Sequence, residues 1–378
     1  MSEYQYYEFQ AIDRPLTAAE MRELREYSSR ARITSTSFVN DYAWGSFKGN
    51  PDAWMERYFD AFLYLANWGT HEFKLRLSSR LLPLTVARDY CGGGRASVRE
   101  ADGKVILSFD SDDEGGGEWV EGQGHLAPLV PLRAELARGD VRALYLGWLL
   151  RAQSGDLDDE DVEPPVPPGL GQPSASLESL ADFLRIDEDL LAVAALASQP
   201  LEEVSPRPED VRAWVTRLPA SDKDDFLSTL LLGTDASRIE ELRQKFLRQR
   251  KPSNPPPETR RTVGELLRAA EAHSEDRLRR EAEERSKEKA RRERSAAAAR
   301  AKYLDGIVGK EPKLWAEVET LIATKQPKSY DRAVELLADL RDLAARKKGS
   351  DFLLRVTALR QANERKPSFL ERLRKVGL

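Results

Sequence analysis

The first eighty residues alternate between two hydrophobic periods. Residues 6–12 (YYEFQAI) are rich in aromatic and apolar side chains and predict a strand. Residues 33–39 (ITSTSFV) alternate like a half-buried strand, and a short strand over 42–47 is compatible with the pattern. Thr17, with Glu20 three residues later, predicts a helix that starts with a capping box.

A second helix is predicted to start at Asn50-Pro51 and to run through Asn67, with Trp54, Tyr58, Phe62 and Leu65 on one side. A strand over His71–Leu77 follows it, and Asp102-Gly103 predicts a hairpin between residues 97–100 and 104–109. The order strand, helix, strand, strand, helix, strand is that of a ferredoxin-like unit.

From Pro128 the pattern becomes helical, and residues 132–151 predict one long helix. The fold class expected is therefore α+β: a ferredoxin-like-type α/β sandwich followed by mostly α-helical domains joined by a long charged helix. The divisions expected are an α+β domain (1–127), a helical domain (128–250) with a Pro-rich connector (154–173), a Pro-rich break and charged rod (251–302), and a C-terminal helical domain (303–378).

Residues 274–302 consist almost entirely of charged residues and alanines, which are strong helix formers. Opposite charges recur four residues apart, as in Glu281–Arg285 and Glu288–Arg292, and each pair adds roughly 0.2–0.5 kcal/mol to an isolated helix. Such a rod would span about 45 Å if it is straight. The sequence is equally compatible with a rod that folds back.

Apolar periodicity returns in residues 303–378 and predicts four helices. The segments YDRAVELLADLRDLA (330–344) and KPSFLERLRKVGL (366–378), together with YYEFQAIDRPL (6–16), resemble a group of uncharacterised bacterial proteins with a helical C-terminal region. The resemblance implies a bacterial origin and carries no known activity.

Composition narrows the cellular location. Cys91 is the only cysteine, so no intramolecular disulfide can form. The N-terminal sequence MSEYQYYEF lacks a basic stretch followed by an apolar run, and no apolar stretch is long enough to span a bilayer. These features predict a soluble cytoplasmic protein with no membrane contact.

Charge is distributed unevenly along the chain. Residues 241–378 contain 35 basic and 22 acidic residues, a net charge of +13, whereas residues 1–240 contain 24 basic and 42 acidic residues, a net charge of −18. This asymmetry predicts either a contact within the chain or a basic region for an acidic partner; solubility alone is an equally good interpretation.

One acidic loop has the spacing of a calcium site. Asp110, Asp112, Glu114 and Glu121 occupy the positions of EF-hand ligands in DSDDEGGGEWVE. An EF-hand loop needs a helix on both sides, and here a strand precedes it. An acidic surface loop is the better interpretation, and we expect no metal and no cofactor.

Catalytic motifs are also weak. The segment Cys91-Gly92-Gly93-Gly94-Arg95 lacks the Lys-Ser/Thr of a phosphate-binding loop, and a flexible loop is the better interpretation. A lone cysteine is more often a buried apolar residue than a nucleophile. The three histidines lie on different predicted elements, so no catalytic residue is predicted.

Nucleic-acid contact is best supported near the C-terminus, where basic residues are less diluted by acids. The candidates for contact with nucleic acid or an acidic partner are Arg346, Lys347, Lys348, Lys366, Arg372, Arg374 and Lys375. A solvated helical surface is the simpler interpretation, because charge runs usually serve solubility.

Three functions therefore stay open. We favour a non-enzymatic intracellular interaction or scaffold protein with a protein partner of unknown identity. The first alternative is a nucleic-acid-associated protein that uses the basic C-terminal region. The second is an enzyme without a local sequence signature, for which Trp44, Trp54, Trp68 and carboxylates near Asp41 are candidate cleft residues.

Overall fold

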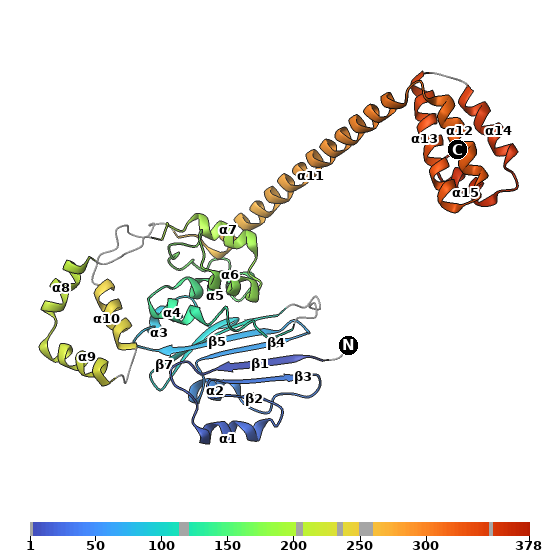
Figure 1. The fold of residues 1–378 in the computed structure, drawn as a ribbon. Helices are drawn as coiled ribbons and strands as arrows, with labels where there is room; N and C mark the ends of the chain where they lie inside the picture. The colour runs from blue at the N-terminus through green and yellow to red at the C-terminus, as the bar shows by residue number, and fades with distance from the viewer. Residues whose placement is uncertain (1–2, 113–120, 202–206, 233–236, 249–259, 348–350) are drawn as a thin grey trace. The chain divides into compact units, whose positions relative to one another are not determined.

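The computed structural model describes residues 3–112, 121–201, 207–232, 237–248, 260–347 and 351–378. The chain forms two compact units, Met1–Arg277 and Leu278–Leu378. The first contains a sheet with helices, and the second is helical (Figure 1). The coarse fold prediction, α+β with mostly helical structure after the sheet and one long charged helix, is confirmed.

The sheet has seven strands in the order β2-β3-β1-β4-β5-β7-β6, and each neighbouring pair is antiparallel. Three of these pairs are consecutive in the chain, whereas β1 pairs with β3 and β4 across helical connections. The strands are β1 (Gln5–Gln10), β2 (Arg32–Ile33), β3 (Ser37–Tyr42), β4 (Ala61–Ala66), β5 (His71–Ser78), β6 (Ala96–Ala101) and β7 (Lys104–Ser111).

Helices α1 (Ala18–Tyr27) and α2 (Pro51–Arg57) cover one face of the sheet (Figure 1). The predicted capping box at Thr17 is present, and Asn50 caps α2. Because side chains alternate along a strand, every second residue of β1 points to these helices. The core on this face includes Phe9, Leu24, Phe38, Trp54, Met55 and Phe62, all buried.

The prediction of one helix from Asn50 through Asn67 is wrong. Helix α2 ends at Arg57, and β4 begins at Ala61. Phe62 packs in the core under α1 and α2, whereas Leu63 packs in the core on the opposite face. A strand buried on both faces has a continuous apolar sequence, which periodicity alone does not distinguish from a helix.

The opposite face of the sheet packs against a second helical layer, so the first unit has three layers (Figure 1). One core joins sheet residues such as Phe73 and Leu107 to helical residues such as Leu144 and Leu180. The layer comprises α3 (Leu84–Arg88), α4 (Pro131–Ala137), α5 (Arg142–Gln153), α6 (Ala175–Leu184) and α7 (Glu188–Leu196).

Helix α5 is buried on nearly all sides. At Gly147 an added Cβ would lie 2.6 Å from Phe109 Cε1, so only glycine allows this close packing on β7. The single helix predicted over residues 132–151 is wrong, because Gly139, with φ of 89°, separates α4 from α5.

Three further helices belong to the first unit: α8 (Pro208–Arg217), α9 (Ala220–Leu232) and α10 (Ser237–Arg248). Trp214 of α8 packs edge-on against Phe246 of α10, with ring centroids 5.5 Å apart. The side-chain amide of Gln244 donates a hydrogen bond to the carbonyl of Ala137, which connects α10 to α4.

Helix α11 (Val263–Ile307) is continuous over 45 residues. Thr262 and Glu265 form a capping box at its start. Val263, Leu266 and Ala270 belong to the core of the first unit, and the helix crosses the unit boundary after Arg277. The charged stretch predicted as a rod is thus helical.

The second unit contains the four helices predicted for the C-terminal region: α12 (Glu311–Ala323), α13 (Pro327–Lys347), α14 (Asp351–Ala362) and α15 (Pro367–Lys375). Their shared core includes Val318, Leu337, Phe352, Phe369 and Leu373. None of the helices in the described parts of the chain combines the length and apolarity needed to cross a bilayer.

Candidate functional site

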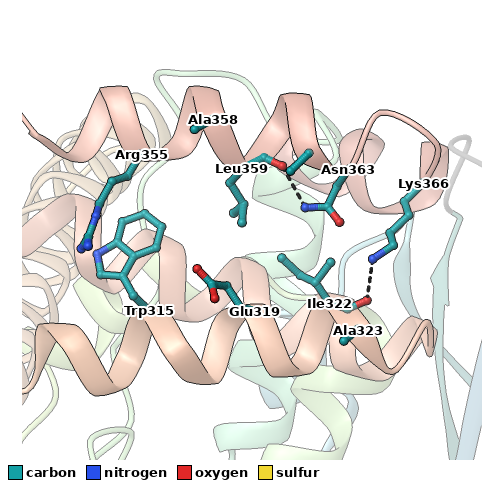
Figure 2. A pocket seen from close by; sticks show the side chains of 10 residues that line it. Trp315, Glu319, Ile322, Ala323, Arg355, Ala358, Leu359, Asn363 and Lys366 are labelled. Atoms are coloured by element: carbon teal, nitrogen blue, oxygen red, sulfur yellow. Dashed lines mark hydrogen bonds between the residues drawn. The ribbon is translucent and has the colours of Figure 1, made fainter.

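Helices α12 and α14 lie side by side in the second unit and leave a groove between them (Figure 2). Each contributes a buried stripe to the core, Val318 and Ile322 from α12 and Val356 and Leu359 from α14. Helix α13 connects α12 to α14 and runs in the opposite direction to both. Helices α12 and α14 therefore point the same way (Figure 2). The groove forms because both helices pack on the same core and leave a gap between them.

The groove has a volume of about 470 Å³. Ligand pockets in proteins occupy roughly 300–1,000 Å³. Figure 2 shows Trp315, Glu319 and Ile322 on the α12 side, facing residues of α14. The small side chains of Ala323, Ala358 and Ala362 also line the groove and keep it open.

A cation lies at each end of the groove. The Arg355 guanidinium carbon lies 5.3 Å from the Trp315 ring centroid, a cation–π distance. Lys366 Nζ donates a hydrogen bond of 3.0 Å to the carbonyl of Ile322, near the end of α12. Glu319 is the only acidic residue among the described residues that line the groove.

The lining of the groove is mostly apolar with a few charged side chains. Among the described lining residues there is no serine, cysteine or histidine and no pair of carboxylates. The groove offers apolar contact area, a tryptophan face, two cations and one carboxylate.

The structure separates the basic residues predicted to contact nucleic acid. Arg346 forms an ion pair with Asp305, just before α12 begins, at 3.1 Å. Lys366 instead contacts Ile322 near the other end of α12. A helix of 13 residues separates these points by roughly 20 Å.

Two of the five remaining basic candidates are also engaged within the chain. Arg372 forms an ion pair with Asp331 at 2.5 Å, and Lys375 pairs with Glu371 at 3.3 Å. Arg374 is exposed. The side chain of Lys347 and the whole of Lys348 lie outside the described residues. These pairs lower the positive field that a phosphate backbone would meet.

The acidic loop holds an arginine at its start. Arg95 Nη1 lies 2.5 Å from Asp110 Oδ1 and 2.6 Å from Asp112 Oδ2, and this contact lowers the pKa of Asp112. Glu121 is exposed, and Glu114 lies outside the described residues. Within the described ranges, no three His, Cys, Asp or Glu side chains gather as metal ligands would.

Cys91 is fully buried, and burial raises the pKa of its thiol to about 12. The glycines that follow it form a tight turn, in which Gly94 has φ of 65°. The backbone N–H of Arg95 donates to Asp156 Oδ2 at 2.5 Å, so a carboxylate occupies the place that a phosphate would take.

Two of the histidines support local structure. His71 stacks on Phe183, and its Nδ1 lies 2.8 Å from the Phe183 carbonyl; burial lowers the pKa of this imidazole. His273 Nδ1 contacts Asp189 Oδ1 at 2.7 Å. The two rings are thus held by different partners on different elements.

The tryptophans considered as cleft residues do not form one site. Trp54 is buried in the core beside α1. Trp44 is 71% exposed, with the Arg30 guanidinium 5.4 Å from its ring centroid, and Trp68 is 45% exposed. Trp44 and Trp68 follow β3 and β4 at the same end of the sheet, separated by β1.

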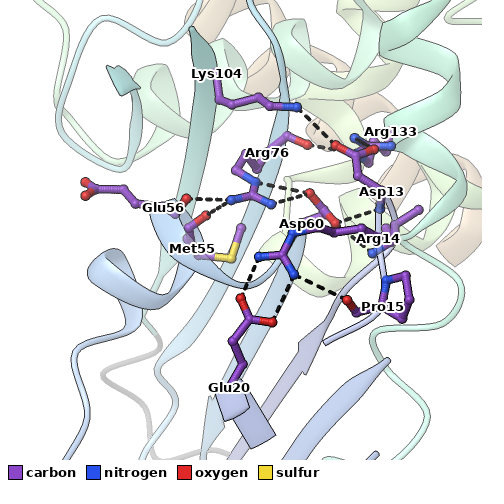
Figure 3. Close-up of polar contacts among 11 residues, drawn as sticks. Asp13, Arg14, Pro15, Glu20, Met55, Glu56, Asp60, Arg76, Lys104 and Arg133 are labelled. Carbon is purple, nitrogen blue, oxygen red and sulfur yellow. Dashed lines mark hydrogen bonds and ion pairs between the residues drawn. The ribbon is translucent and has the colours of Figure 1, made fainter. Parts of the chain in front are cut away.

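A buried ion pair that periodicity does not reveal lies beside the sheet (Figure 3). Asp60 is 1% exposed and accepts hydrogen bonds from the backbone N–H groups of Ile12 and Asp13, at 2.6 and 2.8 Å. Arg76 donates to the same carboxylate and to the carbonyls of Met55 and Glu56. The Asp60 carboxylate and the Arg76 guanidinium find their hydrogen-bond partners within the fold, which indicates a structural role.

A second buried network fixes the start of α11. Glu163 accepts two hydrogen bonds of 2.8 Å from Arg261 and one from the Tyr145 hydroxyl. About two helical turns beyond the core contacts, Arg277 donates to Asp189 of α7 and holds the pKa of that carboxyl well below its usual range.

Comparison with known proteins finds no match among protein-family models, curated proteins or solved structures. The resemblance to a group of bacterial proteins therefore stays a prediction.

Proposed function

We propose that this chain is a non-enzymatic interaction protein whose C-terminal unit binds a helical segment of a partner protein. The observation that carries the proposal is the groove between α12 and α14, with half-buried Trp315 on one wall. Grooves between helices commonly bind the apolar face of a third helix, which inserts side chains at positions i, i+3 or i+4, and i+7.

The length of the groove fits two turns of a partner helix. From Trp315 to Ile322 the α12 wall extends about 10 Å, or two helical turns. Burial of one leucine-sized side chain in such a groove contributes roughly 1.5–3 kcal/mol. Tryptophan and arginine, both present here, are the residue types that most often dominate interface energetics.

The experiment compares two tryptophan substitutions on α14 in affinity purifications of the full-length protein from its source organism. Ala358→Trp fills the groove, whereas Gln361→Trp adds the same side chain at an exposed position of α14 that does not line the groove. We expect Ala358→Trp alone to lose specific protein partners. Identical partner sets for both variants and for the unmodified protein, with unchanged circular dichroism, would refute the proposal.

We do not extend the proposal to nucleic acid. Arg346, Arg372 and Lys375 are paired with carboxylates, and Lys366 lies about one helix length from Arg346. Specific phosphate binding needs such cations clustered and available.

We also infer that residues 5–66 form a ferredoxin-like unit. Their element order is β1-α1-β2-β3-α2-β4, their strand order is β2-β3-β1-β4, and both helices pack on one face. The buried single cysteine supports a cytoplasmic location, where thiols stay reduced. Fractionation of the source cells tests that location.

A further inference from the structure

The polar groups of the groove are arranged asymmetrically. Arg355 and Lys366 stand near its two ends, and Glu319 lies between them on the α12 wall (Figure 2). From these charges and the apolar lining we propose that the occupant is an acidic amphipathic helix of a partner protein. This inference rests on the docking function proposed above and names the class of its ligand.

The apolar contact extends beyond the groove along α14. Leu354, Ala358 and Ala362 are four residues apart, so they form one stripe on the helix, and all three are exposed. Leu354 is 72% exposed, so its side chain is available to a partner. From Leu354 to Ala362 the stripe is about 12 Å long, which a partner helix of eight residues covers.

The cations select the charge of that helix. The Arg355 guanidinium has no hydrogen-bond acceptor among the described residues, and its contact with Trp315 leaves its planar edge open to a carboxylate. Lys366 uses one of its three N–H donors on the carbonyl of Ile322. Both therefore retain donors for an acidic ligand.

The distance between the cations sets the spacing of the acids. The Arg355 guanidinium lies over Trp315 and Lys366 Nζ contacts the Ile322 carbonyl, and these two residues are about 10 Å apart along α12. A partner helix would place acidic residues about two turns apart, on either side of an apolar stripe. A basic helix would meet both cations and only one carboxylate, that of Glu319.

The test uses the full-length protein and two fluorescent 16-residue synthetic peptides. Both peptides carry the same leucine stripe at i, i+4 and i+7; one has glutamates on either side of the stripe and the other has lysines. Anisotropy titrations are made at about 0.05 and 0.3 M salt, because exposed charge contacts weaken as salt rises. The variants are Ala358→Trp, Arg355→Glu and the double variant Arg355→Glu/Lys366→Glu.

We expect the acidic peptide to bind at least tenfold more tightly than the basic peptide at low salt, with less difference at high salt. Arg355→Glu should reduce this preference, the double variant should reverse it, and Ala358→Trp should abolish binding of both peptides. Because Arg355 is exposed, its single substitution keeps the test valid if the double variant does not fold.

The outcomes separate the two proposals. Equal, salt-independent binding of both peptides that is lost in Ala358→Trp would leave the docking function standing and overturn the acidic ligand. A preference for the basic peptide would overturn it as well. Failure of both peptides to bind at 1 mM would overturn the docking function itself. If light scattering shows a dimer and the dimer does not bind the peptides, the occupant of the groove is a second copy of this chain, and the acidic partner helix is overturned.

Discussion

Replacement of Asp60 by alanine should destabilise the first unit more than any single surface substitution. Asp60 accepts hydrogen bonds from two backbone N–H groups and from Nε and Nη2 of Arg76, and both side chains are buried. Asp60→Ala removes all four contacts at once. It leaves the Arg76 guanidinium buried without its counter-charge.

The magnitude follows from these contacts. Removal of one partner from a buried ion pair costs about 3–5 kcal/mol. Arg76 keeps the carbonyls of Met55 and Glu56 as acceptors, which favours the lower end of that range. Ile12 is 37% exposed, so water reaches its vacated N–H and limits that part of the cost. We expect a loss near 3 kcal/mol.

Hydrogen exchange measured by mass spectrometry suits this chain, because it resolves the first unit from the second. A loss of 3 kcal/mol should reduce protection of β1 and β4 amides by roughly a hundredfold. Peptides from α12 and α13 serve as an internal control and should not change.

The matched control is Arg57→Ala, which removes an exposed two-point contact with Glu23. Exposed ion pairs contribute about 0–1 kcal/mol, so protection should fall less than tenfold. If Asp60→Ala changed protection no more than Arg57→Ala does, the assignment of Asp60 and Arg76 as a structural pair would be wrong.

Three further predictions concern the opposite face of the sheet. Glu163→Gln should cost about 1–3 kcal/mol, because it removes the charge that faces Arg261; exchange in the first turns of α11 measures this, and unchanged exchange contradicts it. Cys91 should resist Ellman's reagent at pH 8 in the folded protein and react after unfolding in urea, since burial raises its pKa to about 12; reaction within seconds before unfolding would disprove the burial. Gly147→Ala should lower the Tm, with a cost of about 1–3 kcal/mol, because its Cβ would overlap Phe109; calorimetry that shows an unchanged Tm would contradict this packing.

Local chemistry predicted the elements that depend on few residues. The Thr17 capping box, the Asp102-Gly103 turn and the C-terminal helices all appear where the sequence indicates. Each is specified by hydrogen bonds or backbone angles within a few positions. Amphipathic helices such as α15 are predictable for the same reason, since one face alone is buried.

Elements that depend on tertiary context were missed. The strand from Ala61 to Ala66 is apolar throughout because helices cover both faces of the sheet, and that arrangement is not visible in a sequence window. The break at Gly139 was missed because a helical glycine is tolerated at modest cost. The strand is decided by contacts far away in the sequence, whereas the break at Gly139 is a local helix end.

The candidate groove was only partly accessible to prediction. Trp315 lies in the region 303–378 that was predicted to be helical, and Lys366 was one of the basic candidates, but nothing in the sequence placed them in the same groove. Ala358 and Ala362 can be recognised as groove residues only when α14 is placed beside α12. Arg355 was not among the predicted contacts, because one arginine on a helix has no distinguishing pattern.

The two edge strands of the sheet, β2 and β6, affect how this protein can contact other chains. Strand β2 has only two residues, and the other edge strand, β6, carries Arg99, whose guanidinium is paired with Glu56. Short or charged edges discourage the addition of a strand from another molecule. The protein is therefore poorly suited to aggregate through its sheet or to recruit extended peptides there, which fits the proposal that a helical groove binds its partner.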